Sequence, residues 1–278
     1  MSETTLDFEK KIKVLEEINH NGTIFEICAL EDLDGATSSD MAMNLFFAKQ
    51  QGLKIRFVRI KLNNTKIKTE AGALYYYKGN IQSQTNVGGV GGFLKKTVAG
   101  SLTKESAMKP EYFGCGEIYL EPSFKHYLTV QLENNSVIVD KSMFYCCSDT
   151  VDVKPIFQKN VSSAALGNEG LFQIELSGSG VVILESPVPA SEIQEVWLNP
   201  NEELKVDGNF AILRSSNVQF SVTTSDKSLL GSALNGEGFL NTFRCPQNGV
   251  IWLAPTAPLY KKMAYGLSLD NKGGNSLA

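Results

Sequence analysis

The chain has 278 residues, 42% hydrophobic and 20% charged, which is enough apolar material for one large all-β domain or about two smaller domains. Its 26 Lys and Arg against 30 Asp and Glu give a net charge of −4, which argues against nucleic acid as a partner because dedicated nucleic-acid binders are usually strongly basic. The two histidines, His20 and His126, exclude most histidine-based catalytic and metal sites.

Apolar runs and cysteines indicate the compartment. Residues 1–10 lack the pattern of a secretory leader, and no run approaches the roughly 18 apolar residues of a membrane span. The cysteines are odd in number and lack the spacing of metal ligands: Cys28, Cys115, Cys146, Cys147 and Cys245. We therefore expect free thiols in a reducing cytoplasm, with neither a metal nor a cofactor.

Residues 1–52 are interpreted as an N-terminal extension that differs from the rest of the chain. Residues 10–18 fit either a short helix or a strand, because their apolar positions match both periodicities. Residues 40–51 predict a helix, with Asp40 as its N-cap and Gly52 as its stop. The apolar face of this helix is formed by Met41, Leu45 and Ala48.

From residue 53 onward the pattern is typical of β structure. Apolar residues alternate with basic ones in two runs, which are Leu53, Ile55 and Phe57, then Val58, Ile60 and Leu62. The change of parity between Phe57 and Val58 predicts a β-bulge at that point. Short strands separated by Gly, Asn and Ser turns continue almost to the end, as in a sandwich or barrel.

The β region contains an internal threefold repeat. Residues 74–81, 144–151 and 211–218 each combine an apolar strand, a polar turn and a second strand. After each of them comes another strand that begins at a glycine, and these glycines recur at intervals of 64 and 69 residues. The three strand-initiating glycines are Gly116, Gly180 and Gly249.

The repeat predicts the fold class. We expect an all-β domain over residues 53–270, built from three homologous β modules in a pseudo-threefold, double-stranded β-helix or β-sandwich arrangement. Its modules cover about residues 53–122, 123–190 and 191–260, and residues 271–278 form a frayed tail.

The order of motifs between residues 57 and 256 is similar to that of one known family. The motifs are residues 70–73 with 79–81, residues 116–122, residues 168–172 with 178–180, residues 206–208, and residues 236–238 before the strand of Trp252. In this order they resemble the mitochondrial-biogenesis family called altered inheritance of mitochondria twenty-four.

The resemblance implies an all-β fold akin to the tryptophan RNA-binding attenuation protein. It also implies homo-oligomers, often trimers, and a link to inner-membrane organisation or membrane stress. It brings no catalytic residue with it, so we expect a protein that is not an enzyme.

Two glutamates occupy matching, glycine-flanked turns in two of the modules. These turns comprise Gly167, Glu169 and Gly170 in the second module, and Gly236, Glu237 and Gly238 in the third. If Glu169 and Glu237 met at the pseudo-axis, they would form a carboxylate pair for proton transfer or cation binding. We favour the alternative, in which each glutamate accepts backbone N–H bonds or an ion pair.

Two stretches are candidates for contact with anions or membranes. The glycine-rich residues 87–92 lack the ending of a phosphate-binding loop and predict a flexible loop that contacts a partner or a membrane. Its contact residues would be Phe93, Leu94, Lys95 and Lys96.

The second stretch, residues 54–69, contains six basic residues and no acid, and four of them would face phosphate or anionic lipid: Lys54, Arg56, Arg59 and Lys61. The alternative, which we favour, is a charged sheet edge that blocks aggregation.

The histidines and Cys115 suggest no chemistry. Neither histidine has a Ser or Cys motif nearby, and Cys115, between two glycines, has no adjacent base. We expect structural roles for all three.

Together these patterns favour a non-enzymatic, self-associating scaffold in membrane-linked organisation or stress response. Its expected partners are copies of itself, as a trimer, and a peripheral membrane or a membrane protein. The alternative is a module that binds a small ligand, anionic lipid or nucleic acid. An enzyme that uses Glu169 and Glu237 ranks last.

Overall fold

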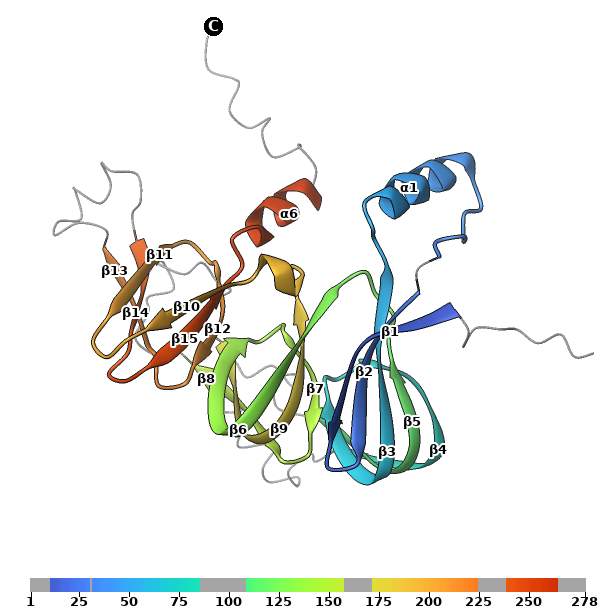
Figure 1. Cartoon of the computed structure of the whole chain (residues 1–278), viewed down its shortest axis with the longest axis horizontal. Helices are drawn as coiled ribbons and strands as arrows, with labels where there is room; N and C mark the ends of the chain where they lie inside the picture. The colour runs from blue at the N-terminus through green and yellow to red at the C-terminus, as the bar shows by residue number, and fades with distance from the viewer. Residues whose placement is uncertain (1–10, 31, 86–108, 158–171, 225–238, 265–278) are drawn as a thin grey trace, which may run out of the picture. The chain divides into compact units, whose positions relative to one another are not determined.

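The computed structural model describes residues 11–30, 32–85, 109–157, 172–224 and 239–264. Over these residues the chain forms fifteen strands in antiparallel sheets and few helical turns, so the predicted all-β class is confirmed (Figure 1). The chain divides into two compact units. The first comprises Met1–Asn135, Ser142–Asp152 and Ser177–Ser186, and the second comprises Ser136–Lys141, Val153–Leu176 and Pro187–Ala278. The division into three pseudo-threefold modules stays a prediction.

The first unit is organised around one central strand. It contains β1 (Ile12–His20), β2 (Thr23–Leu30), α1 (Ser39–Gln50), β3 (Ile55–Thr69), β4 (Leu74–Thr85), β5 (Pro110–Leu120) and β7 (Phe144–Ser148). The residues of β6 (His126–Asp140), β8 (Val151–Phe157) and β9 (Phe172–Ser186) divide between the two units. β3 is central because it pairs with β2, β5 and β7, while β1 extends the sheet beyond β2 and β4 pairs with β5.

The alternatives left open for residues 10–18 resolve as a strand. β1 pairs with β2 in an antiparallel hairpin whose last pair is His20 with Thr23. The two turn residues, Asn21 and Gly22, have φ of 50° and 85°, the left-handed conformation that a two-residue hairpin requires. The N-terminal residues therefore contribute two strands to the sheet in addition to the predicted helix.

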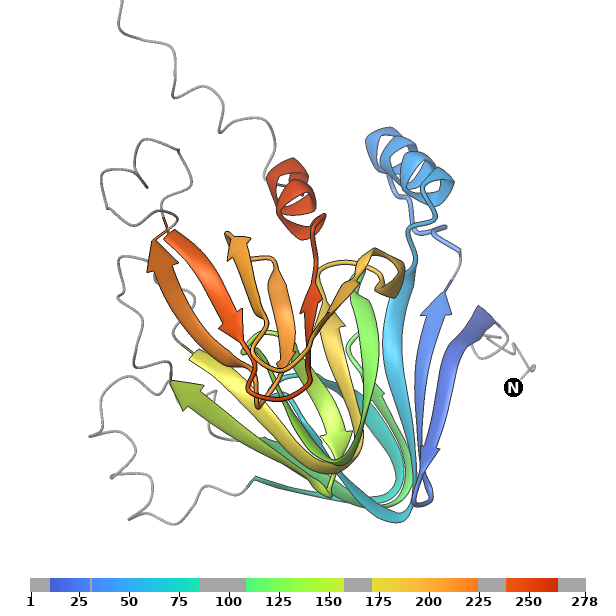
Figure 2. The same cartoon turned by 60° about the vertical axis from the view of Figure 1, so that its left-hand side comes forward.

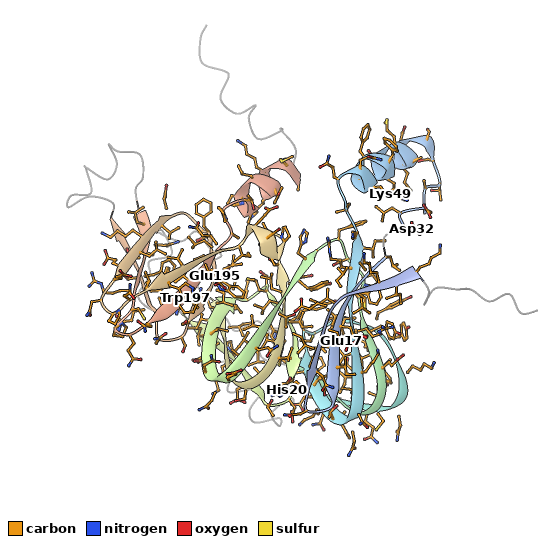
Figure 3. The ribbon with its side chains drawn as sticks, viewed as in Figure 1. Glu17, His20, Asp32, Lys49, Glu195 and Trp197 are labelled. Atoms are coloured by element: carbon orange, nitrogen blue, oxygen red, sulfur yellow. The ribbon has the colours of Figure 1, made fainter. Side chains whose placement is uncertain are left out.

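The predicted helix is confirmed, but its N-cap is wrong. α1 begins one residue earlier than expected, and the Ser38 hydroxyl accepts the Met41 N–H at 3.2 Å. Asp40 lies instead in the first turn, where a negative charge is favourable beside the helix dipole. At the other end, Lys49 lies 3.6 Å from Asp32 in the preceding loop (Figure 3).

The β-bulge predicted between Phe57 and Val58 is wrong. β2 and β3 stay in regular register there, and both residues are buried, at 2% and 0% exposure. The parity changes because both faces of β3 are buried at this point. Phe57 packs with Tyr119 on one face, and Val58 packs into the main core on the other. The irregularity in β3 lies at Asn64, whose φ is 54°.

The second unit is a small β-sandwich, which can be followed in Figure 2. It contains η3 (Ala190–Glu192), β10 (Gln194–Leu198), β11 (Glu203–Asp207), β12 (Ala211–Ser215), β13 (Gln219–Thr224), β14 (Phe239–Arg244), β15 (Gly249–Leu253) and α6 (Ala257–Ala264). β11, β14 and β13 form one sheet, whereas β15 pairs with β10 and β12. Val206 and Phe243 from the first sheet pack with Leu198 and Ile251 from the second, so the two sheets share one core.

The repeated glycines make the same contact in all three places. Gly249 begins β15, whereas Gly116 lies within β5 and Gly180 within β9, and each packs against the buried β-branched residue that ends the preceding repeat motif. A Cβ atom on Gly116 would lie 3.0 Å from Ile81 Cδ1, one on Gly180 would lie 3.0 Å from Val151 Cγ2, and one on Gly249 would lie 2.6 Å from Val218 Cγ2. The nearest atoms would be closer still at two positions, with the Lys78 carbonyl oxygen 2.2 Å from a Cβ on Gly116 and Ser148 Cβ 2.8 Å from one on Gly180. Because real Cβ atoms essentially never approach closer than 3.0 Å, the repeat marks positions where only glycine fits without a shift.

A second contact, a hydrogen bond from a backbone N–H to a serine hydroxyl, recurs in the second and third repeats. The Ser148 hydroxyl accepts the Val181 N–H at 3.0 Å, and the Ser215 hydroxyl accepts the Val250 N–H at 3.1 Å. The first repeat differs, because residues 74–81 run without a turn through β4, with Gly79 at φ 119°. The predicted strand-turn-strand pattern therefore holds for the second and third motifs and is wrong for the first.

The glycine contact predicts a stability effect. Gly180→Ala would place a Cβ 2.8 Å from Ser148 Cβ, so we expect a loss of about 1–3 kcal/mol in unfolding free energy from overpacking. Gly35→Ala is the matched control, because no atom lies within 4 Å of its Cβ position, and it should change stability by less than about 0.5 kcal/mol. Urea unfolding would measure both, and equal stability of the two variants would contradict the prediction.

Candidate functional site

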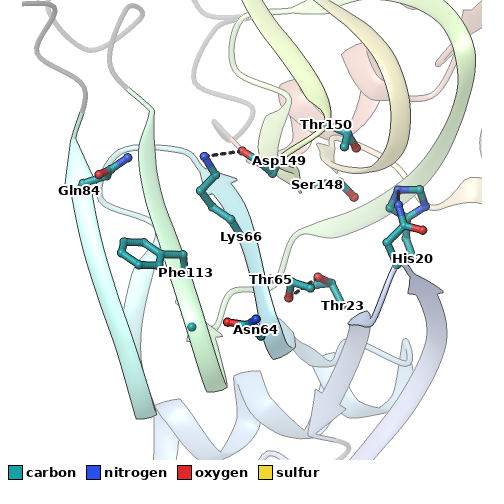
Figure 4. A pocket seen from close by; sticks show the side chains of 12 residues that line it. His20, Thr23, Asn64, Thr65, Lys66, Gln84, Phe113, Ser148, Asp149 and Thr150 are labelled. Atoms are coloured by element: carbon teal, nitrogen blue, oxygen red, sulfur yellow. Dashed lines mark hydrogen bonds and ion pairs between the residues drawn. The ribbon is translucent and has the colours of Figure 1, made fainter.

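A polar pocket of about 540 Å³ opens in the first unit (Figure 4). It forms where the β1–β2 turn, the irregular part of β3, the adjacent parts of β4 and β5, and the end of β7 come together. Its lining consists of His20, Asn21, Thr23, Asn64, Thr65, Lys66, Gln84, Phe113, Gly114, Ser148, Asp149 and Thr150.

The hairpin turn and the irregularity in β3 place one wall of the pocket. Asn21 and Asn64 both adopt positive φ, which Asn tolerates better than most residues. The Thr23 hydroxyl donates to the Thr65 hydroxyl at 2.7 Å, which ties the start of β2 to β3. The Asn21 amide nitrogen lies 3.1 Å from His20 Nε2, so the imidazole is held beside the turn.

An ion pair occupies the middle of the pocket. Lys66 Nζ lies 2.9 Å from Asp149 Oδ1 and 3.6 Å from Glu111 Oε2, while Gln84 Nε2 donates to the same Glu111 oxygen at 2.8 Å. The hydrogen bond to Asp149 and the two nearby carboxylates raise the pKa of Lys66 above its ordinary value. Lys66 therefore stays charged, and its charge is balanced inside the site.

Phe113 supplies the aromatic wall. On β5 it lies opposite Lys66 of β3 and Gln82 of β4, and 36% of its side chain is exposed. Its neighbour Tyr112 points to the other face and is buried in the core, as the alternation along a strand requires. Figure 4 shows Phe113 and Gln84 on one side of Lys66 and His20 on the other.

The sequence did not predict this pocket. Its residues come from five separate segments, and none of them forms a local motif. One feature was available: Asn21-Gly22 between two apolar stretches is a strong hairpin pattern, which would have placed His20 and Thr23 next to each other.

The basic residues predicted as an anion surface divide between different environments. Arg59 Nε and Lys61 Nζ both donate to Glu26, a residue buried at 1% exposure, and the Lys61 bond is 2.7 Å. Arg56 Nη1 donates to the carbonyl oxygen of Lys54 at 3.4 Å. Two of the four cations are thus engaged by one buried carboxylate, and the anion contact stays a prediction.

The alternative of a protective sheet edge is wrong for Arg56, Arg59 and Lys61, whereas Lys54 precedes β3. β3 has partners on both sides, so its basic residues do not line an edge. Their role is internal: burial alone would raise the pKa of Glu26, but the hydrogen bonds and charges of Arg59 and Lys61 outweigh it and hold that pKa below its ordinary value.

The other residues singled out in the sequence lie partly outside the described residues and partly in strands. Gly167, Glu169, Gly170, Gly236, Glu237, Gly238, Phe93, Leu94, Lys95 and Lys96 lie outside the described residues. The five cysteines lie in the described residues and none forms a disulfide, and exposed Cys115 accepts a hydrogen bond from the Asn64 N–H at 3.2 Å. His126 begins β6.

The described residues contain no group of three or more His, Cys, Asp or Glu placed to hold a metal ion. In the same part of the chain, no helix is both long and apolar enough to cross a membrane.

The buried carboxylate predicts a pH-dependent stability. Glu26→Gln leaves Arg59 without its anion, so we expect a loss of about 3 kcal/mol near neutral pH. Glu17→Gln is the control, because exposed Glu17 lies opposite Glu26 on β1 and should contribute less than about 0.5 kcal/mol.

The sign of the pH effect follows from the lowered pKa of Glu26. Its stabilisation is fully present above the unfolded-state pKa of about 4.3 and is lost as the pH falls through the folded-state pKa. The stability gap between wild type and Glu26→Gln should therefore be constant from about pH 7 to pH 5 and shrink in more acidic buffer. Chemical denaturation across this range would measure it, and an unchanged gap at low pH would refute the assignment.

Comparisons with known proteins agree with the predicted fold. The X-ray crystal structure of protein SPYM3_0169 from Streptococcus pyogenes is similar, with a TM-score of 0.54 and 18% sequence identity over 74% of this chain and 92% of that chain. At this identity the likeness shows the fold alone. No curated protein matches the chain. The family model described as Mitochondrial biogenesis AIM24 matches residues 47–256, and the chain therefore belongs to the AIM24 family, as the order of its motifs predicted.

Proposed function

We propose that this chain is a non-enzymatic scaffold that associates with copies of itself through α1. The observation that carries the proposal is that α1, twelve residues long, has no buried residue. Figure 1 shows it standing clear of the strands of its own unit. An isolated helix of this length is marginal in water, so a helix with no packed face needs a partner for stability.

The side chains that α1 exposes are those of a protein interface. Met43, Phe46 and Phe47 share one face at spacings of three and four residues, and they are 56%, 59% and 61% exposed. Met41 adds a further exposed apolar side chain at 41%. Methionine and aromatic residues are enriched at the centre of protein–protein interfaces, where charged residues are depleted.

The charge of α1 favours a second copy over a lipid bilayer. Within Ser39–Gln50 the only charged residues are Asp40 and Lys49, so the helix is neutral, and Lys49 pairs with Asp32. A helix that lies on anionic lipid usually carries several Lys or Arg on its polar face. The net charge of −4 and the engagement of Arg59 and Lys61 by Glu26 likewise give little support to anionic lipid or nucleic acid as the ligand.

Family membership supports the cellular role and location that we propose for this scaffold. Membership of a mitochondrial-biogenesis family favours a role in membrane-linked organisation or stress, with the assembly in the cytoplasm or peripheral to a membrane. The resemblance stated above favours three copies, and three α1 helices around a threefold axis would bury the same apolar face in each copy.

Oligomeric mass tests the proposal. Wild type should elute in size-exclusion chromatography with light scattering at about three times its 30.4 kDa monomer mass. Phe46→Glu combined with Phe47→Glu should give the monomer, because two charges cannot be buried unpaired. Phe124→Glu, which changes a 48% exposed residue elsewhere in the same unit, should leave the oligomer intact.

Three outcomes would contradict the proposal. They are a monomeric wild type at micromolar concentration, a double variant that still oligomerises, and a monomer that floats with phosphatidylglycerol vesicles through α1. Circular dichroism would confirm that the double variant keeps its β fold.

A further inference from the structure

We propose that the pocket of the first unit binds a small, neutral, polyhydroxylated molecule, a sugar or a polyol. The inference is independent of self-association, because α1 contributes nothing to the pocket lining. The cavity of about 540 Å³ lies within the range of about 300–1,000 Å³ in which proteins bind small molecules.

Charge balance selects against ionic ligands. Lys66 is paired with Asp149 at 2.9 Å, and Lys68 Nζ donates to the carbonyl oxygens of Asp149 and Val151 at 2.8 Å each. Glu111 is buried and held by Gln84 and Lys66. Lys66 is thus shared by two carboxylates, and Lys68, which does not line the pocket, is held by two backbone carbonyl oxygens. An anion or cation would have to break one of these contacts before it gained a partner. A hydroxyl group can accept from Lys66 and donate to Asp149 while the pair stays closed.

Hydroxyl and imidazole groups give the pocket polar positions for a ligand. Thr65 Oγ1 accepts from the Thr23 hydroxyl at 2.7 Å and from the Asn63 N–H at 3.3 Å, so both lone pairs are used and its proton is left to donate. The His20 ring, whose Nε2 lies 3.1 Å from the Asn21 amide nitrogen, adds a second polar group to the lining.

The side-chain amides supply the matching acceptors. Gln84 uses its nitrogen on Glu111, which leaves its carbonyl oxygen as an acceptor. Asn64 brings a further amide, exposed at the pocket rim. The lining therefore offers both donors and acceptors, and a hydroxyl group, which both donates and accepts, can pair with either kind.

Phe113 gives the site a second mode of recognition. Its ring is partly exposed and lines the cavity beside Lys66. The face of an aromatic ring is electron-rich, so it attracts the weakly positive C–H bonds on the apolar face of a sugar or inositol ring. Polar groups on one side and an aromatic wall on the other therefore fit a ligand whose edge is polar and whose face is apolar.

Saturation-transfer NMR on the full chain tests the proposal, with glucose, maltose and myo-inositol as neutral probes and with inorganic phosphate and glutamate as charged probes. We expect saturation transfer to at least one neutral probe and no displacement of it by either charged probe. Phe113→Ala should weaken that binding about fivefold, as expected for loss of an aromatic face. Phe124→Ala, which removes an exposed ring outside the pocket, should bind as wild type does.

Each remaining result would overturn the proposal. No transfer to any neutral probe at millimolar concentration would remove the ligand class, and displacement by phosphate or glutamate would identify an ionic site. Unchanged binding by Phe113→Ala would show that the probe binds elsewhere. Because Phe113 is partly exposed, its variant should fold, and a thermal melt would verify this. The Phe46→Glu and Phe47→Glu variant should bind the neutral probe normally, which separates this test from that of self-association.

Discussion

The close approach of a glycine to a buried β-branched residue recurs three times in this chain, at Gly116, Gly180 and Gly249. At each place the strand can pack against its neighbour only because it has no side chain there. In the first unit this closeness extends along β5, where a Cβ on Gly114 would lie 2.1 Å from the Asn80 carbonyl oxygen. Gly114 lines the pocket beside Phe113, so the spacing that holds β4 against β5 also fixes the aromatic wall.

β3 adds an electrostatic constraint to this steric one. Its basic residues reach neighbouring segments on either side: Arg59 and Lys61 hold Glu26 of β2, and Lys66 holds Asp149 after β7. The row of positive charge therefore joins strands within the unit. Because such pairs are costly to leave half made, they favour one register of β2, β3 and β7 over its alternatives.

The sequence predicted what depends on local pattern and missed what depends on strand partners. The all-β class, the helix and the repeated glycines follow from periodicity and spacing, which are readable along the chain. The role of Arg59 was not readable, because a basic residue on a strand looks the same whether it faces solvent or a buried Glu26. The parity change at Phe57 was misread for the same reason, since the presence of core on both faces of β3 depends on tertiary packing.

Both candidate surfaces draw on residues that precede the part of the chain matched by the family model. That match begins at residue 47, so the β1–β2 hairpin and most of α1 lie outside it. His20 and Thr23 close a pocket whose other walls come from β3, β4, β5 and β7, all within the matched range. The part of the chain that the family model matches thus supplies the charged centre and the aromatic wall, and the N-terminal hairpin completes the lining. Family membership alone therefore does not account for either surface, because each depends on residues before position 47.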